Sequence, residues 1–159
     1  MMEALKALLN DFDPSVLLPD LGSLSGHLAG ILRVALLAAP LILLGLGLLY
    51  FLASPREANY KLGFRCRRGM ASVESWRFTQ RLAGIVWSVL GLVLCIVMAV
   101  LAAKFKSMDA EAMAEMAVSC LLWELGLVLL SIIGVNAAVI ILFDRDGVRR
   151  ETPLIPFKK

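Results

Sequence analysis

The sequence is poor in the residues from which soluble enzymes build reactive sites. It contains one histidine and three cysteines, and no two cysteines form a Cys-x-x-Cys pair. Three scattered cysteines argue against a disulfide framework and against a zinc site. Neither a Ser/His/Asp grouping, nor a paired-histidine motif, nor a phosphate-binding glycine loop is found. We therefore expect no catalytic residues, no metal, no cofactor and no enzymatic activity.

Charged residues are also scarce over most of the chain. Hydrophobic residues make up 60% of the sequence and the mean hydropathy is +0.82, whereas soluble domains contain about 45–50% apolar residues. The net charge of +3 would suit a nucleic-acid-binding protein. However, the basic residues gather in short segments beside apolar runs and form no continuous binding face, so we expect no nucleic-acid partner.

Three apolar runs dominate what remains: residues 28–53, 82–103 and 117–143. Each is long enough to cross a hydrocarbon layer of about 30 Å as a helix. The first contains Pro40, which should kink it, because a proline removes one helical hydrogen bond. The pattern predicts an all-α fold, a transmembrane helical bundle of three spans.

The distribution of lysine and arginine predicts the orientation of this bundle. Residues 54–81 contain seven, and the tail after Phe143 contains five, whereas the opposite side contains only Lys6, Lys104 and Lys106. Basic residues favour the cytoplasmic side of short loops. We expect residues 1–27 to be extracytoplasmic, residues 28–143 to form the bundle, and the 54–81 loop and the 144–159 tail to be cytoplasmic. Residues 104–116 would then form a short outer loop.

The first nine residues fit two interpretations. Met1, Leu5, Leu8 and Leu9 have helical spacing, which is typical of an amphipathic helix lying on the membrane surface. A frayed chain end fits the same residues equally well.

The 54–81 connection carries the most specific local signals. Ser54-Pro55 should end the first helix. Ser72 is a good N-cap and Glu74 would lie in a first turn, so a helix should begin near Val73 and run to residue 103. The small and aromatic residues of its next turns share one face, which favours packing between helices: Trp76, Gln80, Gly84, Trp87 and Gly91.

The basic residues Arg65, Arg67 and Arg68 of this connection admit three interpretations. They can anchor the loop to anionic lipid headgroups. They can donate hydrogen bonds to the C-terminal carbonyls of neighbouring helices and so lock the loop. They can also form a docking site for a protein or for an anionic headgroup.

The same connection resembles a known family signature. The residues that carry the resemblance are Asn59, Gly63-Phe64-Arg65, Gly69-Met70, Ser72, Trp76 and Gly84, and they resemble the signature of the SdpI-like membrane protein family over roughly residues 55–100. Phe64, Cys66 and Gly69 stand where the family usually has tyrosine, threonine and serine. The resemblance implies that the candidate binding residues are Asn59, Gly63, Phe64, Arg65, Arg68, Met70 and Trp76.

The resemblance also implies a function and a location. The family's named member is a bacterial immunity protein that protects the cell from its own secreted killing peptide, and it holds a transcriptional repressor at the membrane. We therefore expect a short-form protein of the bacterial cytoplasmic membrane, giving bacteriocin resistance or signal transduction. Its partners would be membrane lipids, an antimicrobial peptide outside and a regulator inside, and a homo-oligomer is compatible with this. Glu111, Glu115 and Glu124 would attract a cationic peptide.

Two alternatives stay open beside this hypothesis. The chain could be a structural or accessory subunit of a membrane complex, or a small transporter or intramembrane enzyme using Arg33 and Glu124. These two residues lie at depths that match within ~3 Å, so they could face each other or share waters. Alternatively, each side chain could reach the headgroups, or Glu124 could be protonated. Asn136, the third intramembrane polar residue, should hydrogen-bond a neighbouring helix.

Overall fold

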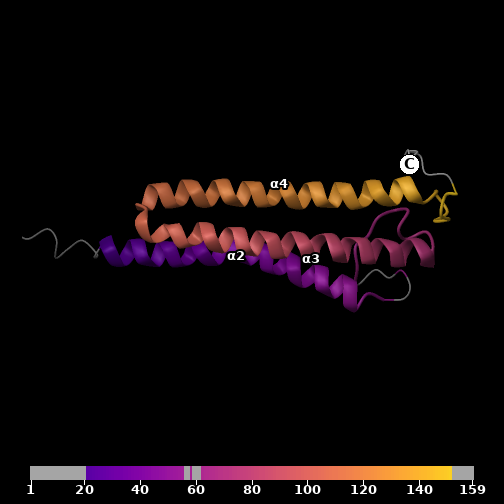
Figure 1. The fold of residues 1–159 in the computed structure, drawn as a ribbon, viewed down its shortest axis with the longest axis horizontal. Coiled ribbons are helices and arrows are strands. Elements are labelled where there is room, and N and C mark those ends of the chain that lie inside the picture. Colours follow the sequence, from indigo (N-terminus) through magenta and orange to yellow (C-terminus); the bar gives the residue numbers. More distant parts are fainter. Residues whose placement is uncertain (1–20, 56–57, 59–61, 152–159) are drawn as a thin grey trace, which may run out of the picture.

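Three long helices form the structure, a computed structural model that describes residues 21–55, 58 and 62–151. They are α2 (Leu21–Leu52), α3 (Val73–Ala103) and α4 (Ala110–Leu142), and a short 3₁₀ helix η2 (Lys104–Ser107) joins the last two. The long helices run alongside one another in alternating directions (Figure 1). Within the described part of the chain there is no β-strand, only an isolated bridge between Phe143 and Arg149.

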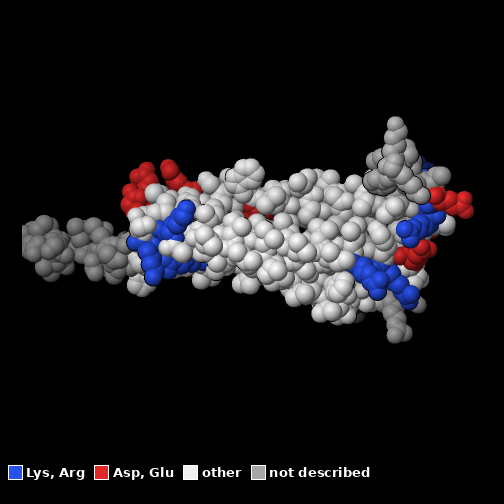
Figure 2. Space-filling model, viewed as in Figure 1, with Lys and Arg blue, Asp and Glu red and all other residues white. Residues whose placement is uncertain are grey.

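The helices have the length and composition of membrane spans, which confirms the predicted fold class. Within the helical segments Gly26–Leu52, Val73–Ser107 and Ala110–Leu142, an 18-residue window has a mean hydropathy of 2.4, 2.8 and 2.7, respectively. Most lysine, arginine, aspartate and glutamate side chains gather at the two ends of the molecule, and the long belt between them is almost free of charge, with one small acidic patch (Figure 2). Such a belt is what a protein needs in order to bury its middle in lipid.

The helix ends differ from the predicted spans because helix continues beyond the apolar runs. The first helix begins at Leu21 rather than at residue 28, and α4 begins at Ala110 rather than at residue 117. Asp109 caps α4, since its carboxylate accepts a hydrogen bond from the backbone nitrogen of Ala112 at 3.1 Å. Helix α3 begins at Val73 and ends at Ala103, as predicted. The predicted surface helix at residues 1–9 lies outside the described residues.

Helix α2 is bent and packs closely on α3. Pro40 lies inside α2, and Figure 1 shows that this helix changes direction along its length, as a proline kink requires. Two glycines of α3 permit the close packing. A Cβ atom added to Gly84 would lie 2.7 Å from the backbone nitrogen of Phe51, and one added to Gly91 would lie 2.6 Å from that of Leu44. The predicted packing face of α3 is thereby confirmed.

The two ends of the bundle are named here by what they contain. The hairpin end consists of the start of α2, helix η2 and the start of α4. The loop end consists of the described part of the connection between α2 and α3, together with residues 143–151 after α4 (Figure 1).

Candidate functional site

The loop end is held together by a buried glutamine of α3. The side-chain oxygen of Gln80 accepts a hydrogen bond from the backbone nitrogen of Phe64, and its side-chain nitrogen donates to the Phe64 carbonyl, both at 2.8 Å. Gln80 is completely buried. A buried backbone donor and acceptor must both be satisfied, and one amide satisfies both. Gln80 therefore fixes the position of the loop on α3.

Two tryptophans of α3 hold the same loop from the side of α2. Phe64 is 7% exposed and packs edge-on against Trp87, with ring centroids 5.5 Å apart. The indole nitrogen of Trp76 donates to the Pro55 carbonyl at 2.9 Å, which ties down the end of α2. Gly63 has φ +119°, and a Cβ atom there would lie 2.7 Å from the Trp76 ring, so only glycine fits this turn.

The start of α3 joins the loop to the segment after α4. Ser72 is the N-cap, as predicted: its hydroxyl accepts from the backbone nitrogen of Ser75 at 3.1 Å, and the Ser75 hydroxyl accepts from the Ser72 nitrogen at 3.2 Å. The Ser72 hydroxyl also donates to the Gly147 carbonyl at 2.6 Å. Gly147 has φ +75° and lies against Ser72. Two segments that are distant in the sequence thus meet at the start of α3.

Arg68 links the loop to the C-terminal end of α4. Its Nη1 atom donates to the carbonyls of Ile140 at 2.8 Å and Phe143 at 3.1 Å. The last carbonyls of a helix lack partners within the helix, and a guanidinium both satisfies them and complements the helix dipole. Of the three interpretations of the basic residues, the locking of the loop on helix carbonyls is therefore confirmed for Arg68.

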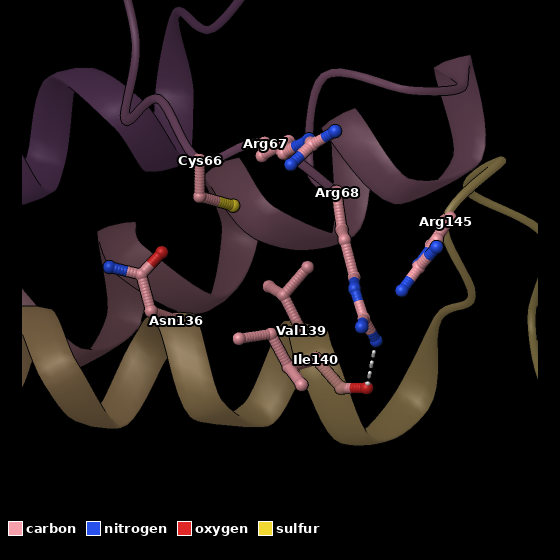
Figure 3. Close-up of a pocket in the computed structure, with 7 residues that line it drawn as sticks. All are labelled: Cys66, Arg67, Arg68, Asn136, Val139, Ile140 and Arg145. Carbon is pink, nitrogen blue, oxygen red and sulfur yellow. Dashed lines mark hydrogen bonds between the residues drawn. The ribbon is translucent and has the colours of Figure 1, made fainter.

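A cavity of about 460 Å³ lies between this loop and α4. Its lining residues come from the loop, from the last turns of α4 and from the segment beyond: Cys66, Arg67, Arg68, Asn136, Val139, Ile140 and Arg145. Figure 3 shows the Arg145 side chain directed toward Arg68, with Arg67 on the same side of the cavity. Burial raises the pKa of the Cys66 thiol, so this side chain is a neutral part of the wall at neutral pH.

Asn136 does not make the predicted hydrogen bond to another helix. Within residues 62–151 and the described part of α2, its side chain has no hydrogen-bond partner, and it lies beside the cavity instead (Figure 3). The nearby Gly134 has open space around it. Asn136 therefore lines the cavity, while its neighbour Val135, which is only 2% exposed, faces the core of the bundle.

The other candidate residues of the loop have different surroundings. Arg65 is exposed and Met70 is half-buried. Met70 lies in a turn whose backbone bond runs from the Met70 nitrogen to the Cys66 carbonyl at 3.1 Å. Asn59 lies outside the described residues. Five of the six described candidates, Gly63, Phe64, Arg68, Met70 and Trp76, help to build or close the loop, which makes them positioning residues.

Arg33 and Glu124 do not form the predicted direct pair. The Arg33 Nε atom donates to the carbonyl of Ala102 at 3.2 Å, near the end of α3. Both carboxyl oxygens of Glu124 are buried without a hydrogen-bond partner in the part of the chain described. Glu124 is only 2% exposed, so its carboxyl group has no direct contact with the surface of the molecule.

Sequence reasoning missed two features of this site. It placed Gln80 on a packing face but gave it no partner, although a lone amide between two tryptophans was a usable signal for a buried hydrogen bond. It also counted Arg145 only as part of the basic tail. The contact between Ser72 and Gly147, which brings that tail back to the loop, left no trace in the local sequence.

Comparison with known proteins places this architecture in a family. No match was found among curated proteins, and none was found among solved structures. A family model, described as the SdpI/YfhL protein family, matches residues 56–143. The match runs from the start of the clamped loop to the end of α4 and includes all the described loop residues discussed above. It covers more than half of the sequence, so this multi-pass membrane protein belongs to the SdpI/YfhL protein family.

Proposed function

We propose that this protein makes a bacterial cell resistant to a membrane-active peptide, or senses such a peptide and reports it to a cytoplasmic regulator. The observation that carries the proposal is the family match over residues 56–143. The structure is compatible with it, because the matched segment has distinct chemistry at its two ends. One end is a clamped basic loop, and the other is a short hairpin with exposed acids.

The hairpin end supplies the surface for a cationic peptide. Asp109, Glu111 and Glu115 are exposed at the start of α4, and Figure 2 shows acidic side chains gathered there. The acids outnumber the two exposed lysines of the same hairpin, Lys104 and Lys106. Exposed acids attract cationic partners, and salt screens this attraction over a length of about 8 Å at physiological ionic strength. In this proposal the hairpin end faces outward, in agreement with the lysine and arginine counts of the sequence.

The loop end supplies the surface for the regulator. Arg65, Arg77 and Arg81 are exposed there, while the backbone that carries Arg65 is fixed through the Gln80 clamp beside it. A rigid arrangement of exposed arginines suits an acidic partner, because little conformational entropy is lost on binding. A transporter or enzyme built on a direct Arg33–Glu124 pair is disfavoured, because Arg33 donates to the Ala102 carbonyl and the Glu124 carboxyl has no hydrogen-bond partner in the described part of the chain.

Growth inhibition tests the proposal. Cells with and without the protein are exposed to a panel of secreted cationic peptides, and the inhibitory concentration of at least one peptide should rise severalfold when the protein is present. The double variant Glu111→Gln/Glu115→Gln should lose part of this protection, whereas Glu74→Gln, an exposed acid at the loop end, should retain it. Equal sensitivity of both strains to every peptide contradicts the proposal, as does a reporter fused to the C-terminus that proves extracellular.

A further inference from the structure

The cavity at the loop end has an unusual charge balance. Three arginines line it, and no aspartate or glutamate is among the lining residues that the structure describes. Arg68 is bonded to carbonyls of α4, whereas the side chains of Arg67 and Arg145 make no hydrogen bond or ion pair anywhere in the described structure. Like charges that line one cavity repel one another, and an anion in the cavity would relieve the repulsion.

The negative end of α4 does not cancel this preference for an anion. Arg68 covers the Ile140 carbonyl, and the Phe143 carbonyl accepts from both Arg68 and the Nε atom of Arg150, the latter at 3.3 Å. The terminal carbonyls are thus already satisfied by cations. This leaves Arg67, Arg145 and the remaining donors of Arg68 for a ligand. Planar guanidinium groups bind phosphate oxygens in pairs, so a phosphate ester is the anion that the cavity fits.

The depth of the cavity indicates the source of this phosphate. Helix α4 has 33 residues and is therefore about 50 Å long. The hydrocarbon layer is about 30 Å thick, which leaves roughly 10 Å of helix beyond it at each end, or six to seven residues. Asn136, Val139 and Ile140 belong to these last residues of α4, so the cavity opens at the level of the lipid headgroups.

On the side of the cavity that faces the hydrocarbon layer, the surface of α4 continues as an apolar strip. Ile133 precedes Ile140 by seven residues and therefore lies on the same face of α4, about two helical turns deeper. Ile133 is 62% exposed and Ile140 is 45% exposed. An acyl chain can run along this strip while its headgroup occupies the cavity. A soluble phosphate compound would gain nothing from these two side chains.

We infer that the cavity bounded by Arg67, Arg68, Arg145 and Asn136 binds the phosphate headgroup of one anionic phospholipid of the leaflet at the loop end. The guanidinium groups hold the phosphate. The Asn136 amide, which has no hydrogen-bond partner in the described part of the chain, lies on the hydrocarbon side of the arginines and meets the glycerol portion of the lipid. This inference is independent of the proposed function, and a negative result for either one leaves the other standing.

Native mass spectrometry of the full chain in neutral detergent tests the inference. The wild-type protein should retain one phosphatidylglycerol molecule and should not retain phosphatidylcholine under the same conditions. The double variant Arg67→Gln/Arg145→Gln should bind phosphatidylglycerol about thirtyfold more weakly, since each basic group near an anionic lipid contributes roughly fivefold. These two side chains make no internal bond in the described structure, and circular dichroism should show unchanged helix content.

The matched control removes the same charge from the same end of the molecule. Arg77 and Arg149 line a different cavity, and the double variant Arg77→Gln/Arg149→Gln should change the affinity less than threefold. A second test variant, Asn136→Leu, keeps all charges and should still weaken binding. Three results overturn the inference: equal weakening by both double variants, equal retention of phosphatidylcholine, or displacement of the lipid by inorganic phosphate, which would indicate a site for a soluble phosphate instead.

Discussion

Replacement of Gln80 with leucine should release the loop that carries Phe64. The native amide satisfies one buried backbone nitrogen and one buried backbone carbonyl of the same residue. Leucine has a similar volume but no polar atoms, so both backbone groups would lose their partner without a large change in packing. An orphaned buried polar group costs about 1–3 kcal/mol. The two together should favour opening of the loop by about 2–6 kcal/mol, which is a roughly 30- to 25,000-fold larger open population.

Limited trypsin cleavage of the detergent-solubilised protein measures this opening. The loop contains tryptic sites after Arg65, Arg67 and Arg68, and cleavage there requires the chain to leave the surface of α3 and α4. The rate of cleavage follows the open population when reclosing is fast. The α-helical content should remain, because Gln80 is not needed for the apolar contacts of the spans.

The control is Glu74→Gln, an exposed substitution in the first turn of the same helix. Its cleavage rate should stay within about twofold of the wild type, because exposed substitutions outside such contacts change stability by about 0.5 kcal/mol or less. If Gln80→Leu is also cleaved within twofold of the wild-type rate, the amide clamp is not what holds the loop.

Three further outcomes follow from the packing and capping contacts. Gly84→Val should strongly lower the midpoint temperature of thermal unfolding, because a Cβ atom there would meet the backbone of Phe51. Gly134→Val should not lower it, because Gly134 has open space around it. Equal effects of the two variants would contradict the packing argument. Arg68→Gln should speed the exchange of the backbone amide hydrogens just after the end of α4 by roughly tenfold or more, since it removes charge-assisted hydrogen bonds worth about 1.5–3 kcal/mol. An unchanged exchange rate would show that Arg68 does not cap α4. At pH 8 the raised pKa of Cys66 lowers its thiolate fraction, so maleimide labelling should be much slower in the folded protein than in denaturant.

The three spans could be predicted from the sequence because hydropathy measures the property that decides them. A run of apolar residues must be long enough to cross the lipid, and nothing else in the chain competes with that requirement. The start of α3 could also be predicted, because Ser72 and Glu74 are local signals for a helix start. The start of α4 was placed seven residues late, because the polar first turns after Asp109 form helix without being apolar.

The position of the loop could be predicted from the sequence, but its contacts with the helices could not. A glycine with positive φ and a row of arginines mark a structured turn, and the lock on helix carbonyls was among the interpretations considered. The partners were out of reach, because Arg68 contacts residues more than 70 positions away and Gln80 contacts residue 64 across a turn. Such contacts depend on how the helix ends converge, which no local pattern encodes.

The absence of a direct Arg33–Glu124 pair shows that the rotation of each helix about its axis, which the sequence does not give, was needed for the prediction. Counting residues along two helices predicts the depth of each side chain, but two side chains at one depth meet only if both helices are rotated toward each other. The rotation of α2 is set by its close approach to Gly84 and Gly91 of α3, where backbone meets backbone. That packing directs Arg33 to the Ala102 carbonyl on α3. Matching depth is therefore necessary for an intramembrane pair but not sufficient, and the small residues that set helix rotation have to be placed first.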